Sequence, residues 1–181
     1  MIPTNRWFLA RNGQPYHVRD AEPADAEFFI DLINRVGAEE QYIADERATL
    51  TVAQQAQLIQ ARHPAYQCLL VAEMGGRLAG SLEMVRGTLK KNQHTAFFGM
   101  ALLPEFRHLG IGRGLLLAAE AWAQAVGVEK IGLTVFETNL AARRLYESLG
   151  YVEEARRREQ FRIGGQPVDE IWMARWLVQV H

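Results

Sequence analysis

Glycines cluster in one short stretch of the chain, where they could take part in binding chemistry. The stretch from Arg107 to Gly114 reads RHLGIGRG; it follows the apolar run 97–103 and leads into an apolar-periodic segment over 115–126. This order predicts a strand, a glycine-rich turn and a helix. The first N–H groups of a helix lack intrahelical partners and carry partial positive charge, and glycines let an anion approach them closely. The stretch therefore predicts a site for a phosphorylated small molecule.

The spacing of these glycines argues against two common phosphate-binding motifs. A Walker loop requires a lysine followed by Ser or Thr directly after its second glycine, and the stretch has no such lysine. A dinucleotide fingerprint requires Gly-x-Gly-x-x-Gly and an acidic residue about 20 residues further on. The glycines here are Gly110, Gly112 and Gly114, and Glu137 lies somewhat too far along. For this stretch alone, a turn that is merely tightened by glycines is the alternative.

A second motif follows the next expected strand, residues 131–136. It runs from Asn139 to Tyr151 and reads NLAARRLYESLGY. With this motif in place, the chain resembles the GCN5-related N-acetyltransferase (GNAT) superfamily. The pattern R-x-x-G-x-G over 107–112 is similar to the acetyl-CoA loop of that family, and the second motif is similar to its second signature. The two signatures occur in the expected order within 95–151, and together they are specific.

The resemblance implies an acetyl-CoA-dependent N-acetyltransferase that moves an acetyl group to a primary amine by direct attack. The segment 159–170 is similar to a bacterial branch that includes amino-acid, antibiotic-analogue and polyamine acetyltransferases, so a small-molecule amine or a protein N-terminus is the expected acceptor. One alternative is a non-catalytic acyl-CoA-binding sensor module, which leaves Tyr146 without a role. Another is an unrelated phosphate-binding α/β protein, which leaves the motif from Asn139 to Tyr151 unexplained.

The resemblance also implies roles for individual residues. Tyr146 is expected to protonate the departing thiolate as general acid, and the backbone N–H of Leu102 to be the oxyanion donor. Asn139 is expected, from its position alone, to cap the following helix. The residues expected to bind acetyl-CoA are Met100, Ala101, Leu102, Arg107, His108, Leu109, Gly110, Ile111, Gly112, Arg113, Gly114, Asn139, Ala142 and Tyr146. Arg143 and Arg144 are further candidates for pairing with phosphate.

Three residues are candidates for the general base: Glu83, His94 and Glu137. They lie on or beside expected strands near the cleft, and Glu83 and His94 could act directly or through water. Each could equally be a polar residue on a strand face. Thr134 occupies the position at which some relatives carry a glutamate base, so no single base is assigned.

The loop over 39–47 is expected to border the acceptor site. It carries Glu39, Glu40, Asp45 and Glu46, whose charge could attract a cationic amine. A solvated acidic loop is the alternative.

Composition agrees with a globular enzyme. The chain has 181 residues, 49% of them hydrophobic, and a net charge of −1, so a single domain over 1–181 is expected and neither nucleic acid nor a membrane is an expected partner. The one cysteine, Cys68, excludes an internal disulfide and a cysteine-cluster metal site, and it lies in an apolar run typical of a core. No metal is expected. The N-terminus lacks a signal pattern, which favours a cytoplasmic protein. Relatives are often dimers, so a homodimer is one of the expected assemblies.

The elements that would hold these residues follow from hydrophobic periodicity and turn residues. The expected helices are 23–37, 51–62, 115–126 and 141–149. The expected strands are 16–19, 66–74, 77–86, 94–103, 131–136, 151–163 and 168–180. Glycine pairs at 75–76 and 164–165 predict hairpin turns. This order predicts an α+β fold with a mixed sheet and helices on both faces. The resemblance adds that the sheet is twisted, mostly antiparallel and splayed in the middle, where the pantetheine arm would lie.

Overall fold

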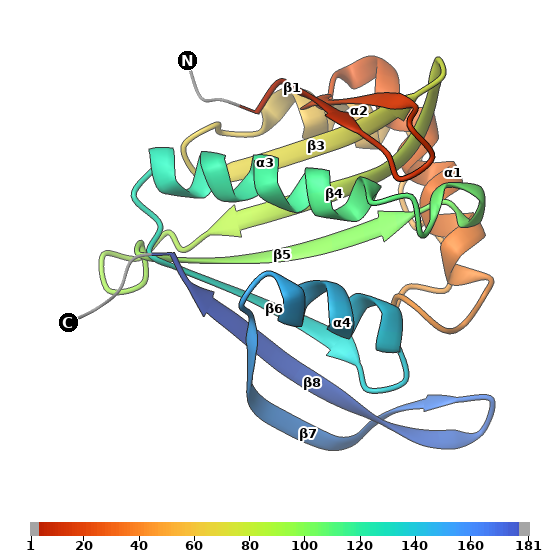
Figure 1. The fold of residues 1–181 in the computed structure, drawn as a ribbon, viewed down its shortest axis with the longest axis vertical. Coiled ribbons are helices and arrows are strands. Elements are labelled where there is room, and N and C mark those ends of the chain that lie inside the picture. The colour runs from red at the N-terminus through yellow and green to blue at the C-terminus, as the bar shows by residue number, and fades with distance from the viewer. Residues whose placement is uncertain (1–3, 178–181) are drawn as a thin grey trace.

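The computed structural model describes residues 4–177, which form one eight-stranded sheet with helices on both faces (Figure 1). The strand order is β1-β2-β3-β4-β5-β6-β8-β7. The strands are β1 (Arg6–Leu9), β2 (Pro15–Asp20), β3 (Gln67–Met74), β4 (Arg77–Arg86), β5 (Thr95–Leu102), β6 (Lys130–Phe136), β7 (Val152–Ile163) and β8 (Gln166–Trp176). The helices are η1 (Pro23–Asp25), α1 (Ala26–Gly37), α2 (Val52–Ala61), η2 (Pro104–Phe106), α3 (Ile111–Ala125) and α4 (Leu140–Ser148), of which η1 and η2 are short 3-10 helices.

The sheet is split in its middle. Adjacent strands pair antiparallel except β5 and β6, which run parallel and pair only from Thr95 opposite Lys130 to Phe97 opposite Gly132. Beyond Phe97 the two strands diverge, and α4 lies beside the widening gap (Figure 1). The α+β class and the mixed, mostly antiparallel sheet with a central split are therefore confirmed.

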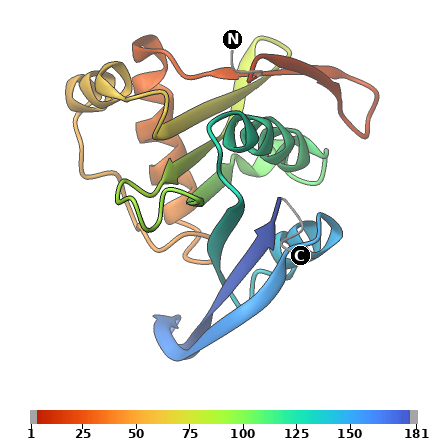
Figure 2. The same ribbon diagram turned by 90° about the vertical axis from the view of Figure 1, so that its left-hand side faces the viewer.

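The two faces of the sheet are covered by different helices. Figure 2 shows α1 and α2 on one side and α3 and α4 on the other. Because side chains alternate along a strand, β3 contributes to both cores. Leu69 and Val71 pack with Phe29 of α1 and Ile59 of α2. The larger core lies under α3, whose buried apolar side chains face the opposite side of β3 and β4.

Local sequence signals account for the element ends. Thr51 caps α2, and its side chain and that of Gln54 form a reciprocal capping box. Gly75 and Gly76 have positive φ angles and join β3 to β4 as expected. The helix after the glycine-rich turn begins at Ile111, earlier than the apolar pattern from 115 indicated, because the glycines themselves take helical geometry.

β1 is a strand that the sequence pattern did not reveal. It has only four residues, lies at the edge of the sheet and shows no buried–exposed alternation, since Trp7 and Leu9 are exposed. Aromatic stacking holds it to β2, with Trp7 against His17 and Phe8 against Tyr16. The expected strand 168–180 is β8, and its last residues fall outside the described part of the chain.

A buried polar network joins α3 to the strands beyond the split. Glu120 of α3 accepts hydrogen bonds from the Tyr151 hydroxyl at 3.1 Å and from the Arg175 guanidinium at 2.9 Å. Each carboxylate oxygen of a buried glutamate needs such partners, because an unpaired buried charge is strongly destabilising. The network therefore fixes the position of β8 relative to α3.

One further expectation concerns the interior. Cys68 is buried in the larger core, as its apolar surroundings predicted. Of the helices within residues 4–177, none combines the length and the apolar character that crossing a membrane requires.

Candidate active site

A cleft of about 1210 Å³ opens where β5 and β6 separate. Every residue that was expected to bind acetyl-CoA lines it: Met100 to Leu102, Arg107 to Gly114, and Asn139, Ala142 and Tyr146. The structure thus brings the two sequence signatures together on one cavity.

The glycine-rich loop ends in a helix terminus that is open to an anion. Gly110 precedes α3 with a φ of 86°, a conformation that favours glycine. Its carbonyl accepts the N–H groups of Arg113 at 3.1 Å and Gly114 at 3.3 Å. The N–H groups of Ile111 and Gly112, in the first turn of the helix, lack intrahelical acceptors. They are therefore available to phosphate oxygens.

Gly112 leaves room that a side chain would fill. A Cβ there would lie 3.2 Å from Met100 Cε, 3.3 Å from Leu145 Cδ2 and 3.5 Å from Leu102 Cδ1. These three side chains come from β5 and α4, so the glycine lies where the loop, the strand and the helix meet. A side chain at this position would therefore enter the space between the loop and the split.

Tyr16 of β2 contacts the glycine-rich loop and helps to hold it in place. Its hydroxyl donates to the Gly110 carbonyl at 3.1 Å, and a Cβ at Gly114 would overlap that hydroxyl. Burial raises the pKa of Tyr16 to about 12, so the hydroxyl keeps the proton that it donates. Tyr16 lines the cleft, although its sequence context marked it only as a strand residue.

The β5 backbone presents hydrogen-bonding groups to the split. Leu103 N–H donates to the Ala79 carbonyl at 2.9 Å, toward β4. Since successive N–H groups of a strand point to opposite edges, Ala101 also faces β4, and Met100 and Leu102 face the split. The placement of Leu102 N–H thus agrees with a donor to a bound carbonyl group.

Tyr146 lies at the inner end of the cleft. Its side chain is 6% exposed, and its ring meets Phe98 edge-on with centroids 5.7 Å apart. Burial raises the pKa of Tyr146 above its ordinary value, so the hydroxyl remains protonated. The residue both packs in the core and reaches the cleft.

The three candidate bases lie in different places. Glu83 lines the cleft. His94 stacks on Trp176 at a centroid distance of 6.4 Å, away from the residues that form the cleft wall. Glu137 accepts the backbone N–H of Asp169 at 3.0 Å and pairs with Arg156 at 3.1 Å. Of the three candidates, only Glu83 lines the same cleft as Tyr146.

Glu83 is in register with Gly99 of β5 and Leu69 of β3. Surrounding protein removes water from the carboxyl group, and this desolvation raises the pKa of Glu83 above its ordinary value. The side chain nevertheless remains accessible from the cleft. This combination of access and raised pKa is typical of groups that exchange protons.

The acidic loop is fastened to the end of β5 by Arg107. The guanidinium pairs with both carboxylate oxygens of Glu39, at 2.6 and 2.7 Å, and lies 4.2 Å from the Tyr42 ring centroid. Its Nε donates to the Leu102 carbonyl at 3.1 Å. Arg107 therefore holds the loop against the cleft, in which Tyr42 and Asp45 form part of the wall.

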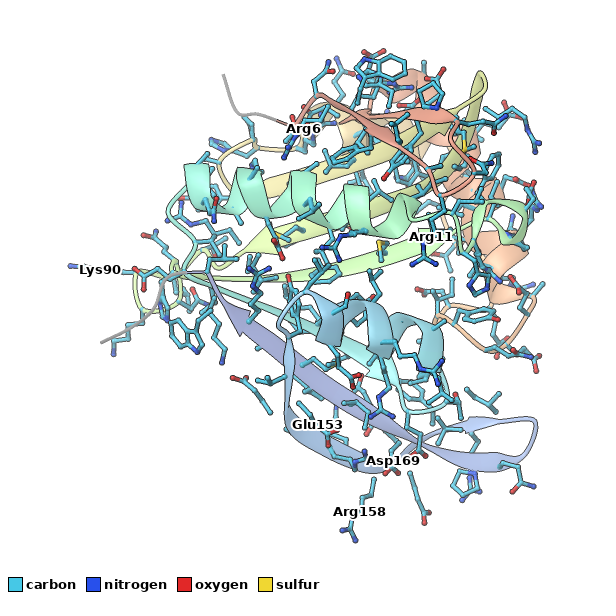
Figure 3. All side chains as sticks on the ribbon, in the orientation of Figure 1. Arg6, Arg11, Lys90, Glu153, Arg158 and Asp169 are labelled. Carbon is cyan, nitrogen blue, oxygen red and sulfur yellow. The ribbon has the colours of Figure 1, made fainter. Side chains whose placement is uncertain are left out.

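Charge is unequally distributed along the cleft. Arg11, Arg113 and Arg144 line it near the glycine-rich loop, and Figure 3 shows Arg11 beside the N-terminal end of α3. Its carboxylates come from other elements: Glu83 from β4, Glu170 from β8 and Asp45 from the acidic loop. Of the other expected phosphate ligands, Arg143 instead donates to the Glu137 carbonyl at 3.3 Å.

Arg11 is a charged cleft residue that sequence reasoning missed. It lies in the turn between β1 and β2, and its backbone N–H donates to the Leu109 carbonyl at 2.9 Å. Its side chain is 3.5 Å from the His108 carbonyl. No motif marks this arginine, because only the pairing of β1 with β2 brings it to the loop.

The site contains no cluster typical of a metal centre. Within residues 4–177, His, Cys, Asp and Glu side chains do not gather in groups of three or more that could hold a metal ion.

The chain is similar to known proteins in sequence and in fold. A sequence model of the acetyltransferase (GNAT) family matches residues 29–151. A GNAT-family acetyltransferase from Streptococcus pneumoniae superposes with a TM-score of 0.83 and 28% identity, over 90% of this chain and 99% of that one. The yncA protein of Salmonella typhimurium, solved with its cofactor acetyl-CoA, superposes with a TM-score of 0.81 and 22% identity, over 92% of this chain and 96% of that one. The second likeness concerns the fold alone.

A shorter similarity exists to the mycothiol acetyltransferase of Thermobispora bispora. The sequences are 50% identical over 48 residues, which are 26% of this chain and 16% of that protein. The chain thus matches about a sixth of that relative's length.

Proposed function

The chain belongs to the GNAT acetyltransferase family, and on this premise we propose that it transfers the acetyl group of acetyl-CoA to a primary amine by direct attack. The acceptor is a small molecule, such as an amino acid, a polyamine or an antibiotic-like amine, or a protein N-terminus. The observation that carries the proposal is the meeting of both signatures, Tyr146 and Glu83 on one cleft at the split of the sheet.

The residues of the cleft fit acetyl-CoA. The free N–H groups of Ile111 and Gly112 suit a pyrophosphate, and the missing side chain at Gly112 leaves a passage to the split. Arg113 supplies positive charge beside them. When bound, acetyl-CoA supplies the thioester carbonyl that accepts the amine. The backbone N–H of Leu102 stabilises negative charge on that oxygen.

Glu83 and Tyr146 together account for every proton that moves in the proposed reaction. The ammonium form of the acceptor loses two protons as its C–N bond forms and the C–S bond breaks. Glu83 takes one proton and passes it to solvent, and Tyr146 gives its own proton to the sulfur. The second proton from nitrogen restores Tyr146, so the products are the N-acetyl amine, the CoA thiol and one proton.

Release of CoA that depends on an added amine tests the proposal. Purified protein with acetyl-CoA is expected to release CoA with at least one of four classes of acceptor: amino acids, polyamines, aminoglycosides and N-terminal peptides. Tight binding of acetyl-CoA without release in any class would support a binding module instead of an enzyme.

Glu83→Gln should lower kcat/KM by about 100-fold, because the amide cannot take a proton. In the unaltered enzyme the base works only when ionised, and its raised pKa means that ionisation occurs at a higher pH than for an ordinary glutamate. The rate should therefore increase with pH through that pKa and then level off. A pH profile of kcat/KM measures this, and the variant should lose the rising limb that belongs to Glu83. An identical profile in both proteins would exclude Glu83 as the base.

Arg11→Ala should weaken acetyl-CoA binding by about 10-fold at low salt, because one charge-assisted contact to phosphate is lost. Isothermal titration at low and high salt measures the effect, which should shrink as salt screens the interaction. Arg6→Ala is the matched control, since it removes an arginine of the same hairpin that does not line the cleft. Equal affinity in the two variants would show that Arg11 does not contact the ligand.

A further inference from the structure

A second hollow of about 370 Å³ continues the cleft along the sheet. Val85 and Phe97 line both spaces, and Trp172 lines the far side of the second. These three apolar side chains are 41%, 40% and 39% exposed, which is high for large apolar residues that lie side by side. The side on which the hollow joins the cleft is therefore apolar, whereas Arg86, Asn92, Lys130 and Glu154 line other parts of it.

The strand registers place these residues on one face of the sheet. Val85 pairs with Phe97 across β4 and β5, and Phe97 pairs with Gly132 of β6. A Cβ at Gly132 would lie 3.1 Å from Phe97 Cδ2, so the ring rests against the bare backbone there. The Phe97 and Trp172 rings have centroids 5.6 Å apart. Together they form a wall suited to a flat apolar group.

Glu83 lies on the same face, between the split and this wall. It precedes Val85 by two residues on β4, which corresponds to a separation of about 7 Å along the strand. Partial desolvation makes it a site where a positive charge is favoured, since an adjacent cation compensates for the lost water. A ligand with a short spacer can therefore reach the Glu83 carboxylate with one end and the apolar wall with the other.

The surroundings of Glu83 disfavour a second, negative group on the ligand. Glu170, 8% exposed, also lines this end, where Arg157 at 3.3 Å and the Trp172 indole N–H at 2.9 Å already contact one of its oxygens. The cations on this side of the cleft already have partners: Arg107 pairs with Glu39, Arg86 donates to the Gln93 carbonyl at 2.6 Å, and Lys130 pairs with Glu154 at 2.7 Å. Among the residues that the structure describes on this side, a carboxylate next to the acceptor amine would therefore lie beside Glu83 without a free cation to pair with it.

We propose that the acceptor is a primary amine on a short spacer that ends in an apolar, preferably aromatic, group and carries no carboxylate beside the amine. This inference rests on the proposed acetyl transfer and specifies its substrate class. The ammonium group pairs with Glu83, and the apolar group lies in the second hollow against Val85, Phe97 and Trp172. The transfer step is the one described above.

A set of four amines tests this assignment: phenethylamine, ethylamine, phenylalanine and spermidine. We expect kcat/KM for phenethylamine to exceed that for ethylamine by at least about 10-fold, because the ring is removed from water in the hollow. We expect phenylalanine, which adds only a carboxylate, to be at least about 10-fold poorer than phenethylamine. Preference for spermidine or phenylalanine would overturn the inference and leave the acetyltransferase proposal intact. Absence of turnover with all amines tried would instead count against acetyl transfer itself.

Val85→Phe tests the hollow directly, because a larger side chain at this accessible position fills it. The ratio of kcat/KM for phenethylamine to that for ethylamine should fall by at least about 10-fold. Leu89→Phe is the control, since Leu89 is 68% exposed and lines neither space, and it should leave the ratio unchanged. Phe97→Leu removes the aromatic ring from the apolar wall and should also lower this ratio of kcat/KM values. It replaces Val85→Phe as the test if that variant does not fold.

An unchanged ratio in folded Val85→Phe would overturn the inference. A dimer in solution that this substitution dissociates, with no change in the ratio, would assign the apolar wall to contact with a second copy of the chain.

Discussion

Replacing Tyr146 with phenylalanine should lower kcat by about 100-fold while the affinity for acetyl-CoA changes less than about 2-fold. The hydroxyl is the only group lost, and the ring can keep its edge-on contact with Phe98. Because burial holds the pKa of Tyr146 above its ordinary value, the group is a protonated donor throughout the working pH range. Steady-state rates together with direct titration of acetyl-CoA separate the two quantities.

Tyr66→Phe is the matched control, since it makes the same chemical change at a tyrosine that does not line the cleft. The control should retain the full rate. If Tyr146→Phe also retained it, the tyrosine would be a packing residue and the thiolate would take its proton from water.

Introducing glutamate at Gly112 should weaken acetyl-CoA binding by at least about 100-fold. Even a Cβ would come within 3.2 Å of Met100 and 3.3 Å of Leu145, so a longer side chain must occupy the passage to the split. The added carboxylate would also repel phosphate at the helix terminus. Titration calorimetry with acetyl-CoA measures the loss.

Gln124→Glu adds the same charge to the exposed, opposite end of α3, and it should bind acetyl-CoA normally. Circular dichroism shows whether Gly112→Glu is folded. A folded variant with unchanged affinity would contradict the assignment of the loop to the phosphates.

Residues whose type is dictated by backbone geometry could be predicted from the sequence. Asn139 was expected as an N-cap, and its side chain accepts the Ala142 N–H at 3.2 Å. The glycine pairs of both hairpins have positive φ angles, and the turn before α3 is glycine at its left-handed position. Such positions tolerate few residue types, so a single sequence displays them.

Features that depend on strand register could not be predicted. Glu83, His94 and Glu137 were equivalent candidates in sequence, and only the pairing of β4 with β5 turns Glu83 toward the cleft. β7 and β8 pair with register shifts, at Glu153 to Ala155 and at Arg157 to Phe161. Alternation along such strands does not indicate which side chains share a face.

Contacts between segments that are distant in the sequence could not be predicted either. Arg11 meets the glycine-rich loop from the β1–β2 turn, and Arg107 holds Glu39 from the acidic loop. Arg107 was expected among the residues that bind acetyl-CoA, and Glu39 in an acidic loop that is solvated or attracts an amine. Arg107 and Glu39 form their bidentate ion pair because the chain after α1 folds back beside the end of β5. The residues around Arg107 or around Glu39 do not indicate this contact.

The split in the sheet is open toward both of its faces. Gly112 and Tyr146 border it from the side of α3 and α4, whereas Glu83 and Phe97 border it from the side of α1 and α2. In the proposed reaction, acetyl-CoA and the amine therefore meet at the split from opposite faces of the sheet. Arginines beside the glycine-rich loop and the carboxylate of Glu83 suit ligands of opposite charge. Both substrates are then held at once when the acetyl group moves, as direct attack requires.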